Sequence, residues 1–177
     1  MRIVGGTYRS RTLFTFEGED IRPTSDKVRE SLYNILQNRV YGCRFLDLFC
    51  GTGAMGIEAL SRGAEYVAFN DRARTSVALT KRNLEKLGIF EKIKVYNLDA
   101  LTFLKTTEEK FDIVYIDPPY KSQLGKEALK IVSLVLKEDG IVVFEDEKPF
   151  EDKVDGLDCY DRRKYGRVHL AFFKKGE

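Results

Sequence analysis

The sequence predicts an α/β domain with a doubly wound, mostly parallel sheet of seven strands. From residue 44 onward, short apolar segments alternate with segments of helical periodicity, the pattern of a parallel sheet covered by helices on both faces. Residues 111–116 are apolar except for Asp112, as expected of a central strand buried on both sides. A pair of strands near the C-terminus comes after the last helix, with no helix between the two, which predicts an antiparallel hairpin at one edge.

The apolar pattern assigns the core elements in chain order. We expect strands at residues 44–49, 65–70, 92–98, 111–116 and 140–145, and edge strands near 157–162 and 167–174. Helices are expected at residues 54–62, 74–87, 100–104 and 124–137. Gly88 directly follows the second of these helices, at a position where glycine commonly ends a helix.

The first 43 residues are predicted to extend this core at its N-terminus. Residues 1–177 would then form one domain, made of an extension (1–43) and an α/β core (44–177). Gly5-Gly6 separates two short segments of strand character, which predicts a hairpin. An amphipathic helix is expected at residues 24–39, with an apolar side formed by Val28, Leu32, Ile35 and Leu36.

Composition excludes several classes of protein. Apolar residues make up 43% of the 177, and 12 Phe and 9 Tyr are too many for an intrinsically disordered chain. No apolar run reaches the ~18 residues that cross a membrane, and the N-terminus lacks the apolar run of a signal peptide. Three cysteines and one histidine are too few for a disulfide framework or a zinc site. We therefore expect a cytoplasmic protein with no metal and no membrane partner.

The net charge of +2 conceals an uneven distribution. Residues 1–44 contain 8 Lys/Arg and 5 Asp/Glu, residues 45–160 contain 16 and 21, and residues 161–177 contain 6 and 2. The two ends are basic and the middle is acidic. Short charged runs are usually solvated surface, so this pattern is only a weak indication of a polyanionic partner.

A glycine-rich turn joins the first strand of the core to its first helix. Gly51, Gly53 and Gly56 have the spacing G-x-G-x-x-G, and Asp71 follows Gly51 by 20 residues, at the end of the next strand. Such glycines let the backbone approach a ligand, and such an acid accepts hydrogen bonds from a ribose. The turn alone leaves a nicotinamide dinucleotide and S-adenosylmethionine as alternatives.

Two acids favour the cationic sulfonium cofactor. Asp47 lies four residues before Gly51, where its charge would oppose a pyrophosphate but suit a cation. Asp99 and Ala100 follow the third strand, where the carboxylate can accept a hydrogen bond from an adenine N6 amine. The acids therefore shift the interpretation toward a methyl donor.

The motif Asp117-Pro118-Pro119-Tyr120, which follows the fourth strand, decides the interpretation. Two consecutive prolines lack backbone donors and fix φ, so they make a stiff elbow, at the strand end where ligands of open α/β sheets bind. The Asp117 carboxylate and the Pro118 carbonyl suit the two hydrogens of an exocyclic amine, and the Tyr120 ring suits the face of its base. This arrangement would aim the nitrogen lone pair at a methyl carbon.

Both motifs resemble a known family. Asp47-Leu48-Phe49-Cys50-Gly51-Thr52-Gly53 with Asp117-Pro118-Pro119-Tyr120 is similar to the class I S-adenosylmethionine-dependent amino-methyltransferases, which have a Rossmann-like fold. The narrower resemblance is to the bacterial RsmD family, which methylates N2 of one guanine in small-subunit (16S) ribosomal RNA. It depends on residues 2–11, 22–32 and 164–166 and covers essentially the whole chain.

The resemblance implies roles for the site residues. S-adenosylmethionine would be bound by Asp47, Phe49, Gly51, Gly53, Asp71, Asp99 and Ala100. The catalytic residues holding the guanine would be Asp117, Pro118, Pro119 and Tyr120. Asp71 would take the ribose position and Asp99 the adenine. The family usually has Glu where Asp71 stands, so the shorter side chain would loosen the ribose contact, and the adjacent Asn70 could assist it.

Basic residues near both ends are the candidates for RNA contact: Arg2, Arg9, Arg11, Arg22 and Lys164. Tyr8 lies among the N-terminal arginines, a composition that suits phosphates and a stacked base. An edge strand protected by charge, or a solvated turn, would have the same composition. The family resemblance favours RNA.

We therefore expect an enzyme that transfers a methyl group from S-adenosylmethionine to guanine N2 in small-subunit ribosomal RNA, either free or within a partly or fully assembled subunit. One alternative is a DNA adenine-N6 or cytosine-N4 methyltransferase, although such enzymes commonly have a larger target-recognition segment. The others are a nicotinamide-dependent oxidoreductase and a non-catalytic RNA-binding protein that retains the fold.

Overall fold

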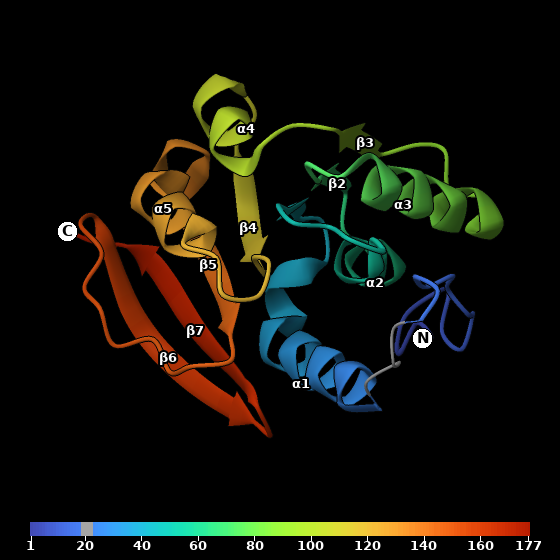
Figure 1. The fold of residues 1–177 in the computed structure, drawn as a ribbon, viewed down its shortest axis with the longest axis horizontal. Helices are drawn as coiled ribbons and strands as arrows, with labels where there is room; N and C mark the ends of the chain where they lie inside the picture. The colour runs from blue at the N-terminus through green and yellow to red at the C-terminus, as the bar shows by residue number, and fades with distance from the viewer. Residues whose placement is uncertain (19–22) are drawn as a thin grey trace.

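The computed structural model describes residues 1–18 and 23–177, without the side chains of residues 23–25. The elements of this part of the chain follow one another as α1 (Pro23–Val40), β1 (Arg44–Asp47), α2 (Ala54–Ser61), β2 (Tyr66–Asn70), α3 (Arg74–Leu87), β3 (Ile93–Tyr96), α4 (Ala100–Thr106), β4 (Phe111–Ile116), α5 (Leu124–Ile131), β5 (Leu136–Asp146), β6 (Leu157–Tyr165) and β7 (Val168–Lys175) (Figure 1). A short 3-10 turn, Val132–Leu134, follows α5.

The described strands form one seven-stranded sheet in the order β3-β2-β1-β4-β5-β7-β6. Strands β1 to β5 pair in parallel, whereas β7 pairs antiparallel with both β5 and β6. The predicted α/β class, with its parallel core and antiparallel edge hairpin, is confirmed. The strand order reverses between β1 and β4, and ligands of open α/β sheets bind at the carboxyl ends beside such a reversal.

Helices cover both faces of the sheet, and strand residues alternate between them (Figure 1). Phe45 and Ile113 pack with apolar residues of α1, α2 and α3. Their neighbours Leu46 and Val114 pack with α4 and α5 on the opposite face. Within the described ranges, no helix combines the length and the apolar character needed to cross a membrane.

The connection between α5 and β5 differs from the prediction. The helix expected at residues 124–137 ends at Ile131, and the next strand begins earlier than expected, at Leu136. Several β-branched residues lower the helix propensity of this stretch. The Val135 carbonyl accepts a hydrogen bond from the Phe111 amide at 2.8 Å. Pairing with β4 thus replaces the last turns of the helix.

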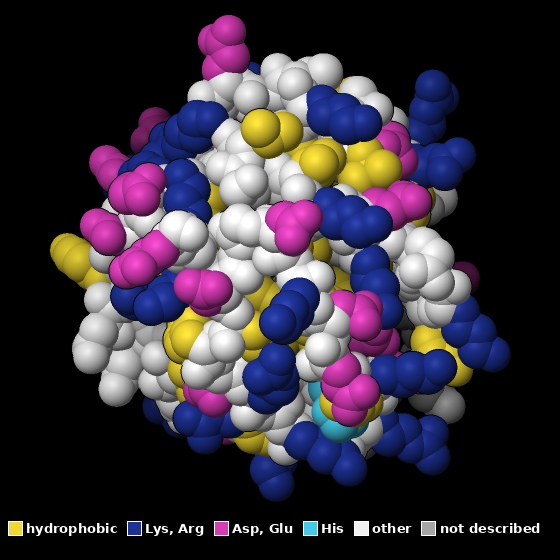
Figure 2. All heavy atoms as spheres, turned by 90° about the vertical axis from the view of Figure 1, so that its left-hand side faces the viewer, with side chains coloured by type: hydrophobic (Ala, Val, Ile, Leu, Met, Phe, Trp, Pro, Cys, Tyr) yellow, Lys and Arg dark blue, Asp and Glu magenta, His cyan; other side chains and the backbone are white. Residues whose placement is uncertain are grey.

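The β6–β7 hairpin extends past the carboxyl end of β5. His169 pairs with Lys164 within the hairpin and with Asp146, the last residue of β5. Since β4 and β5 are parallel, the tip of the hairpin lies at the same edge of the sheet as the end of β4. Figure 2 shows Lys and Arg side chains gathered along the bottom of this face, the level to which the hairpin descends in Figure 1.

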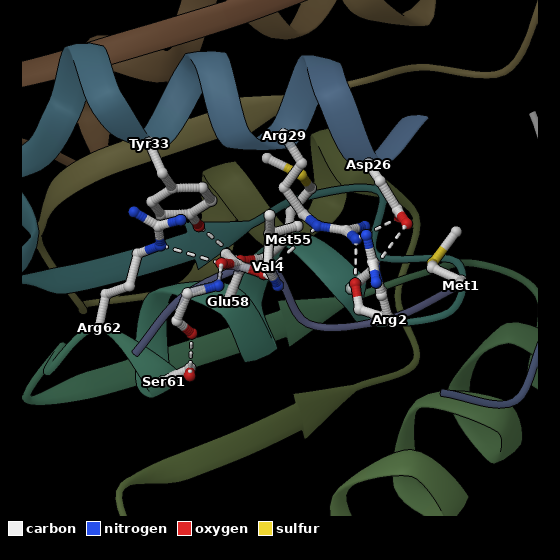
Figure 3. A network of polar contacts seen from close by, with 12 residues as sticks. Met1, Arg2, Val4, Asp26, Arg29, Tyr33, Met55, Glu58, Ser61 and Arg62 are labelled. Carbon is white, nitrogen blue, oxygen red and sulfur yellow. Dashed lines mark hydrogen bonds and ion pairs between the residues drawn. The ribbon is translucent and has the colours of Figure 1, made fainter. Parts of the chain in front are cut away.

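A buried carboxylate holds the N-terminal segment and α1 against α2 (Figure 3). Glu58 of α2 is 0% exposed and accepts hydrogen bonds from the backbone amides of Val4 at 3.0 Å and Gly5 at 2.8 Å. Arg62 Nε donates to it at 2.9 Å, and Arg29 Nε lies 3.4 Å from Glu58 Oε2. Donors from three segments therefore compensate the desolvation of one charge.

The same network continues along α1. Arg29 is buried, and one of its terminal nitrogens donates to Asp26 Oδ1 at 2.7 Å and to the Arg2 carbonyl. The hydroxyl of Tyr33, one of the largest fully buried side chains, donates to the Met55 carbonyl at 2.5 Å. Helix α1 is thereby tied to α2 through polar as well as apolar contacts.

The predicted N-terminal hairpin forms as a short, irregular antiparallel pair within residues 1–18. An antiparallel bridge joins Arg2 and Thr12, and the Leu13 amide donates to the Met1 carbonyl at 3.0 Å beside it. The turn of this hairpin also binds α2. The Thr7 amide donates to the Ser61 carbonyl at 2.7 Å. Gly6 has φ +76°, and a Cβ there would lie 1.9 Å from the Ser61 carbonyl oxygen. Backbone amides in the turn of the hairpin therefore bond to Glu58 and Ser61, which anchors the hairpin on α2.

Glu58→Gln is expected to lower the free energy of unfolding by about 3–5 kcal/mol, because it leaves the buried Arg29 charge without this partner. Lys126→Ala, which breaks the exposed Lys126–Asp152 ion pair, is the control and should cost at most about 1 kcal/mol. Urea unfolding of both variants measures the difference. A Glu58→Gln loss no larger than that of the control would contradict this account of the network.

Candidate active site

The predicted site residues gather at the carboxyl edge of the parallel strands. Asp47, the last residue of β1, is level with Phe69 in β2 and Tyr115 in β4. The residues that follow these three strands are therefore neighbours. They include the glycine turn, Asp71 and the segment that begins at Asp117.

Two left-handed glycines shape the turn between β1 and α2. Gly51 and Gly53 have φ of +53° and +81°, which side chains disfavour. A Cβ on Gly53 would lie 2.9 Å from Thr80, whereas one on Gly51 would meet no atom within 4 Å. The space beside Gly51 is therefore open to a ligand.

Asp47 lies beneath the turn and is 1% exposed. Its Oδ2 accepts a hydrogen bond from the Gly56 amide, in the first turn of α2, at 3.0 Å. This carboxylate satisfies a helix amide that the N-cap residue Gly53, without a side chain, leaves unbonded. Burial raises the pKa of Asp47 to about 7, an effect that the Gly56 hydrogen bond opposes and Asp71 reinforces. A cationic ligand nearby would favour the ionised form.

Asp71 connects the glycine turn to the start of α3. Its Oδ2 accepts a hydrogen bond from the Gly51 amide at 3.0 Å, and its Oδ1 accepts one from the Ala73 amide at 2.9 Å. The half-buried carboxylate lies beside the open side of the turn, where a ribose would need an acceptor. Asn70 is fully buried and its side-chain amide donates to two backbone carbonyls. It joins strand ends and is not exposed for a ribose contact.

The remaining predicted cofactor residues lie on the opposite face of the sheet from α3. Asp99 is the N-cap of α4, and its Oδ1 accepts hydrogen bonds from the amides of Leu101 at 3.0 Å and Thr102 at 3.2 Å. Ala100 is buried, and the half-buried Phe49 packs against the same apolar cluster. The cap fixes the Asp99 carboxylate in place beside the strand ends, which suits the predicted adenine contact.

The elbow after β4 presents its side chains outward. Asp117 is exposed, and Tyr120 is 67% exposed although it is aromatic. The Ser122 amide donates to the Pro119 carbonyl at 3.1 Å, which closes the turn behind the ring. The predicted base-binding residues therefore share one rigid turn at the edge of the sheet.

Gly125 of α5 supports the elbow and was not among the predicted site residues. A Cβ on Gly125 would lie 2.5 Å from Pro118 Cγ and 2.7 Å from the Phe144 ring. The proline ring therefore packs directly on the helix backbone. A glycine inside a helical pattern commonly has such a packing reason. Its place within the predicted helix was therefore the signal in the sequence that could have identified Gly125.

Asn83 of α3 connects the glycine turn to the N-terminal segment and was also missed. It is fully buried, and its side-chain nitrogen donates to the Thr52 carbonyl at 2.9 Å and the Phe14 carbonyl at 3.1 Å. Its oxygen accepts a hydrogen bond from the Phe14 amide at 2.7 Å. The signal was a polar residue directly before Leu84, on the buried side of an amphipathic helix.

The predicted RNA-contacting residues lie on two sides of this edge. Exposed side chains are found for Arg2, Arg9, Arg11 and Lys164. The three arginines belong to the N-terminal segment, beside the glycine turn, and Lys164 belongs to the β6–β7 hairpin. Arg2 Nε is 3.7 Å from the Asp26 carboxylate, which partly neutralises it. Arg22 lies outside the described residues.

A cluster of one aromatic ring and two cations beside the N-terminal segment was not predicted. Phe14 is 39% exposed, and Arg82 and Lys86 of α3 lie 4.6 Å and 4.4 Å from its ring centroid. The two cations are four residues apart and share one face of the helix. Aromatic rings flanked by cations are typical of surfaces that bind single-stranded nucleic acid. The basic i, i+4 pair was the signal in the sequence.

The polar groups at the carboxyl edge of the sheet fit S-adenosylmethionine. The turn is open at Gly51, and carboxylates at Asp47, Asp71 and Asp99 suit a cation, a ribose and an amine. The same charges would oppose the pyrophosphate of a dinucleotide. In the part of the chain that the structure describes, no group of His, Cys, Asp or Glu side chains is arranged to hold a metal ion.

The chain is similar to known proteins over its whole length. The profile of a family described as "Conserved hypothetical protein 95" matches residues 1–174. YlbH of Bacillus subtilis, named provisionally as an rRNA methyltransferase, is 37% identical over an alignment of 182 residues that covers 99% of each chain. Ribosomal RNA small subunit methyltransferase D of Haemophilus influenzae is 36% identical over 153 residues, 84% of this chain and 79% of that protein. The solved structure of Escherichia coli yhhF, described provisionally as a methyltransferase, has a TM-score of 0.87 at 26% identity and covers 100% of this chain and 98% of its own.

Asp47→Asn is expected to change how stability depends on pH. The pKa of Asp47 is raised from 3.8 to about 7 in the folded protein. The protonated carboxyl group therefore stabilises the folded state fully below about pH 4, and this stabilisation is lost as the pH rises toward 7. Asn does not titrate and can still accept the Gly56 hydrogen bond. The variant should therefore gain stability relative to the parent between acidic and neutral pH. Urea unfolding of both proteins at two such pH values measures this, and a pH-independent difference would contradict it.

Proposed function

Since the chain belongs to the RsmD family, we propose that it transfers a methyl group from S-adenosylmethionine to the exocyclic N2 amine of one guanine in small-subunit ribosomal RNA. Family membership confirms S-adenosylmethionine as the cofactor, as predicted from the glycine turn together with the acids and the motif after the fourth strand. It sets aside the nicotinamide alternative. The names of the relatives point to ribosomal RNA, and the choice of guanine N2 is our extension. A cytoplasmic location is consistent with this substrate.

The observation that supports base methylation most strongly is the elbow at the end of β4. Asp117 and the Pro118 carbonyl offer two acceptors beside the exposed Tyr120 ring, and the Pro118 ring is fixed against Gly125. An aromatic face and two acceptors are the groups that hold a base bearing an exocyclic amine. The open side of the glycine turn lies at the same edge, after the neighbouring strand β1.

In this proposal the elbow promotes methyl transfer by positioning the guanine amine. When bound, S-adenosylmethionine supplies a methyl group activated by a cationic sulfur. The guanine amine is a weak nucleophile because its lone pair is delocalised into the ring. Two acceptors on its N–H bonds favour pyramidal nitrogen and direct the lone pair outward, which is an orientation effect. Asp117, which is exposed at this edge, would accept the proton that the amine releases on methylation and pass it to solvent.

Basic groups on both sides of the site support an RNA substrate. The N-terminal segment places arginines and the exposed Phe14 beside the glycine turn. The β6–β7 hairpin has Arg162, Arg163, Lys164 and Arg167 exposed on the other side, in the region where Figure 2 shows basic side chains gathered. An RNA strand lying across the carboxyl edge of the sheet would meet cations on both sides and the elbow between them. Contacts to its phosphates would then position the target base.

Asp117→Ala is expected to reduce methyl transfer at least about 100-fold, because the variant lacks a preorganised acceptor for the reacting amine. The affinity for S-adenosylmethionine should stay within a few-fold, since Asp117 belongs to the base site. Labelled donor is incubated with small ribosomal subunits and, separately, with free 16S RNA and DNA. The exposed Asp139 at the opposite end of β5 provides the control, Asp139→Ala.

The product of the parent enzyme distinguishes the alternatives. N2-methylguanosine in digests of the RNA supports the proposal. Labelled N6-methyladenine or N4-methylcytosine in DNA would replace it with the DNA methyltransferase hypothesis. Parental turnover by Asp117→Ala would refute the role of the elbow.

Charge removal on either side of the site should weaken RNA binding mainly at low salt. Arg9→Ala and Lys164→Ala are each expected to lower the slope of log affinity against log salt by ~0.7 for each phosphate that the protein no longer neutralises. Lys130→Ala, on the exposed face of α5, should leave the slope unchanged. If all three variants kept the parental slope, RNA would not lie across these two surfaces.

A further inference from the structure

Glu145, near the end of β5, lies beside the proposed base site and has no role in the account above. The register of β4 and β5 pairs Tyr115 with Val143 and Ile116 with Phe144. Glu145 is the next residue of β5, and Asp117 directly follows the end of β4. The charges of both carboxylates raise the pKa of Tyr115, so both lie near its hydroxyl. Because side chains alternate along a strand and Val143 is level with Tyr115, the side chains of Tyr115 and Glu145 point to the same face.

The Glu145 carboxylate is held in place from below. Tyr115 is 3% exposed, and its hydroxyl donates a hydrogen bond to Glu145 Oε2. Burial, together with the charges of Glu145, Asp117 and Asp47, raises the pKa of Tyr115 well above its ordinary value. The hydroxyl therefore stays protonated at neutral pH and remains a donor. A carboxylate has about four acceptor positions, so it can accept hydrogen bonds from more than one donor at the same time.

Guanine differs from the other amine-bearing bases in the group next to its amine. Its N1 carries a hydrogen directly beside the N2 amine, whereas the ring nitrogen beside the amine of adenine or cytosine carries a lone pair. An ionised carboxylate accepts hydrogen bonds and donates none. Placed opposite that ring position, it would bind guanine and repel the other two bases, which is discrimination by both attraction and repulsion.

We propose that Glu145, oriented by Tyr115, accepts the N1 hydrogen of the target guanine and so determines which base the elbow methylates. This inference rests on the proposed function, because it assigns a residue to the recognition of that substrate. Asp117 and Pro118 hold the amine, which many bases possess, and Glu145 reads the neighbouring ring nitrogen, which distinguishes guanine.

The test varies the base and the enzyme together. Small-subunit RNA is ligated with guanosine, 2,6-diaminopurine or 6-thioguanosine at the nucleotide where the parent enzyme forms N2-methylguanosine. 2,6-Diaminopurine keeps the 2-amino group but lacks the N1 hydrogen, and 6-thioguanosine keeps both. The parent, Glu145→Gln, Tyr115→Phe and the control Glu138→Gln, an exposed residue elsewhere on β5, are compared by kcat/KM. Melting shifts with S-adenosylmethionine confirm that each variant is folded.

The parent should prefer guanosine over 2,6-diaminopurine by about 100-fold or more, as expected when a buried polar group is left unpaired. Its kcat/KM for RNA with 6-thioguanosine should lie within about tenfold of that for guanosine, since one altered atom outside the contact has a modest effect. Glu145→Gln should reduce that preference below about tenfold, because its amide can donate to the lone pair of 2,6-diaminopurine. Tyr115→Phe should weaken the preference only a few-fold, and Glu138→Gln should leave it unchanged.

Two results would overturn the inference while leaving the proposed function in place. One is equal methylation of guanosine and 2,6-diaminopurine by the parent enzyme, which needs no variant to be folded. The other is parental discrimination by Glu145→Gln. Absence of N2-methylguanosine with the parent enzyme would instead refute the proposed function and the inference with it.

Discussion

The buried carboxylate of Glu58 is the constraint on which the arrangement of the molecule depends. An ionised group with no exposed surface must be matched by donors, and here these are two N-terminal amides, Arg62 of the same helix and Arg29 of α1. The N-terminal segment, α1 and α2 must therefore meet at one place. Because α2 begins at the glycine turn, fixing this helix also fixes the open side of the turn relative to the segment that presents Arg9 and Arg11. The buried charge of Glu58 thus fixes the glycine turn relative to the basic N-terminal segment.

Acidic and basic residues lie in different places at the carboxyl edge of the sheet. Carboxylates follow the strands β1, β2 and β4, where a cationic cofactor and an amine are expected, and basic residues lie outside them on the N-terminal segment and the β6–β7 hairpin. The small net charge of +2 is a cancellation between these two regions. It therefore says nothing against an RNA partner, whose backbone would contact the margins while one base enters between them.

The features that the sequence predicted are those determined by local chemistry. Alternating apolar runs, the left-handed glycines of the turn and the stiff proline elbow depend on neighbouring residues, and all three were located correctly. Contacts between distant residues could not be read in the same way. The N-terminal hairpin was located, but its attachment to Glu58 and Ser61, more than 50 positions away, could not be predicted. For the same reason, nothing near Asn83 in the sequence shows that it bonds to Thr52 and Phe14.

The central claim is that the Glu58 carboxylate holds the N-terminal segment on the catalytic core. Amide hydrogen exchange of the parent and of Glu58→Gln at Val4 and Gly5 tests this most directly, with the Thr7 amide, which binds Ser61, as an internal reference. We expect Val4 and Gly5 to lose protection in the variant by a larger factor than Thr7. Unchanged protection at Val4 and Gly5 in a folded Glu58→Gln protein would contradict the account.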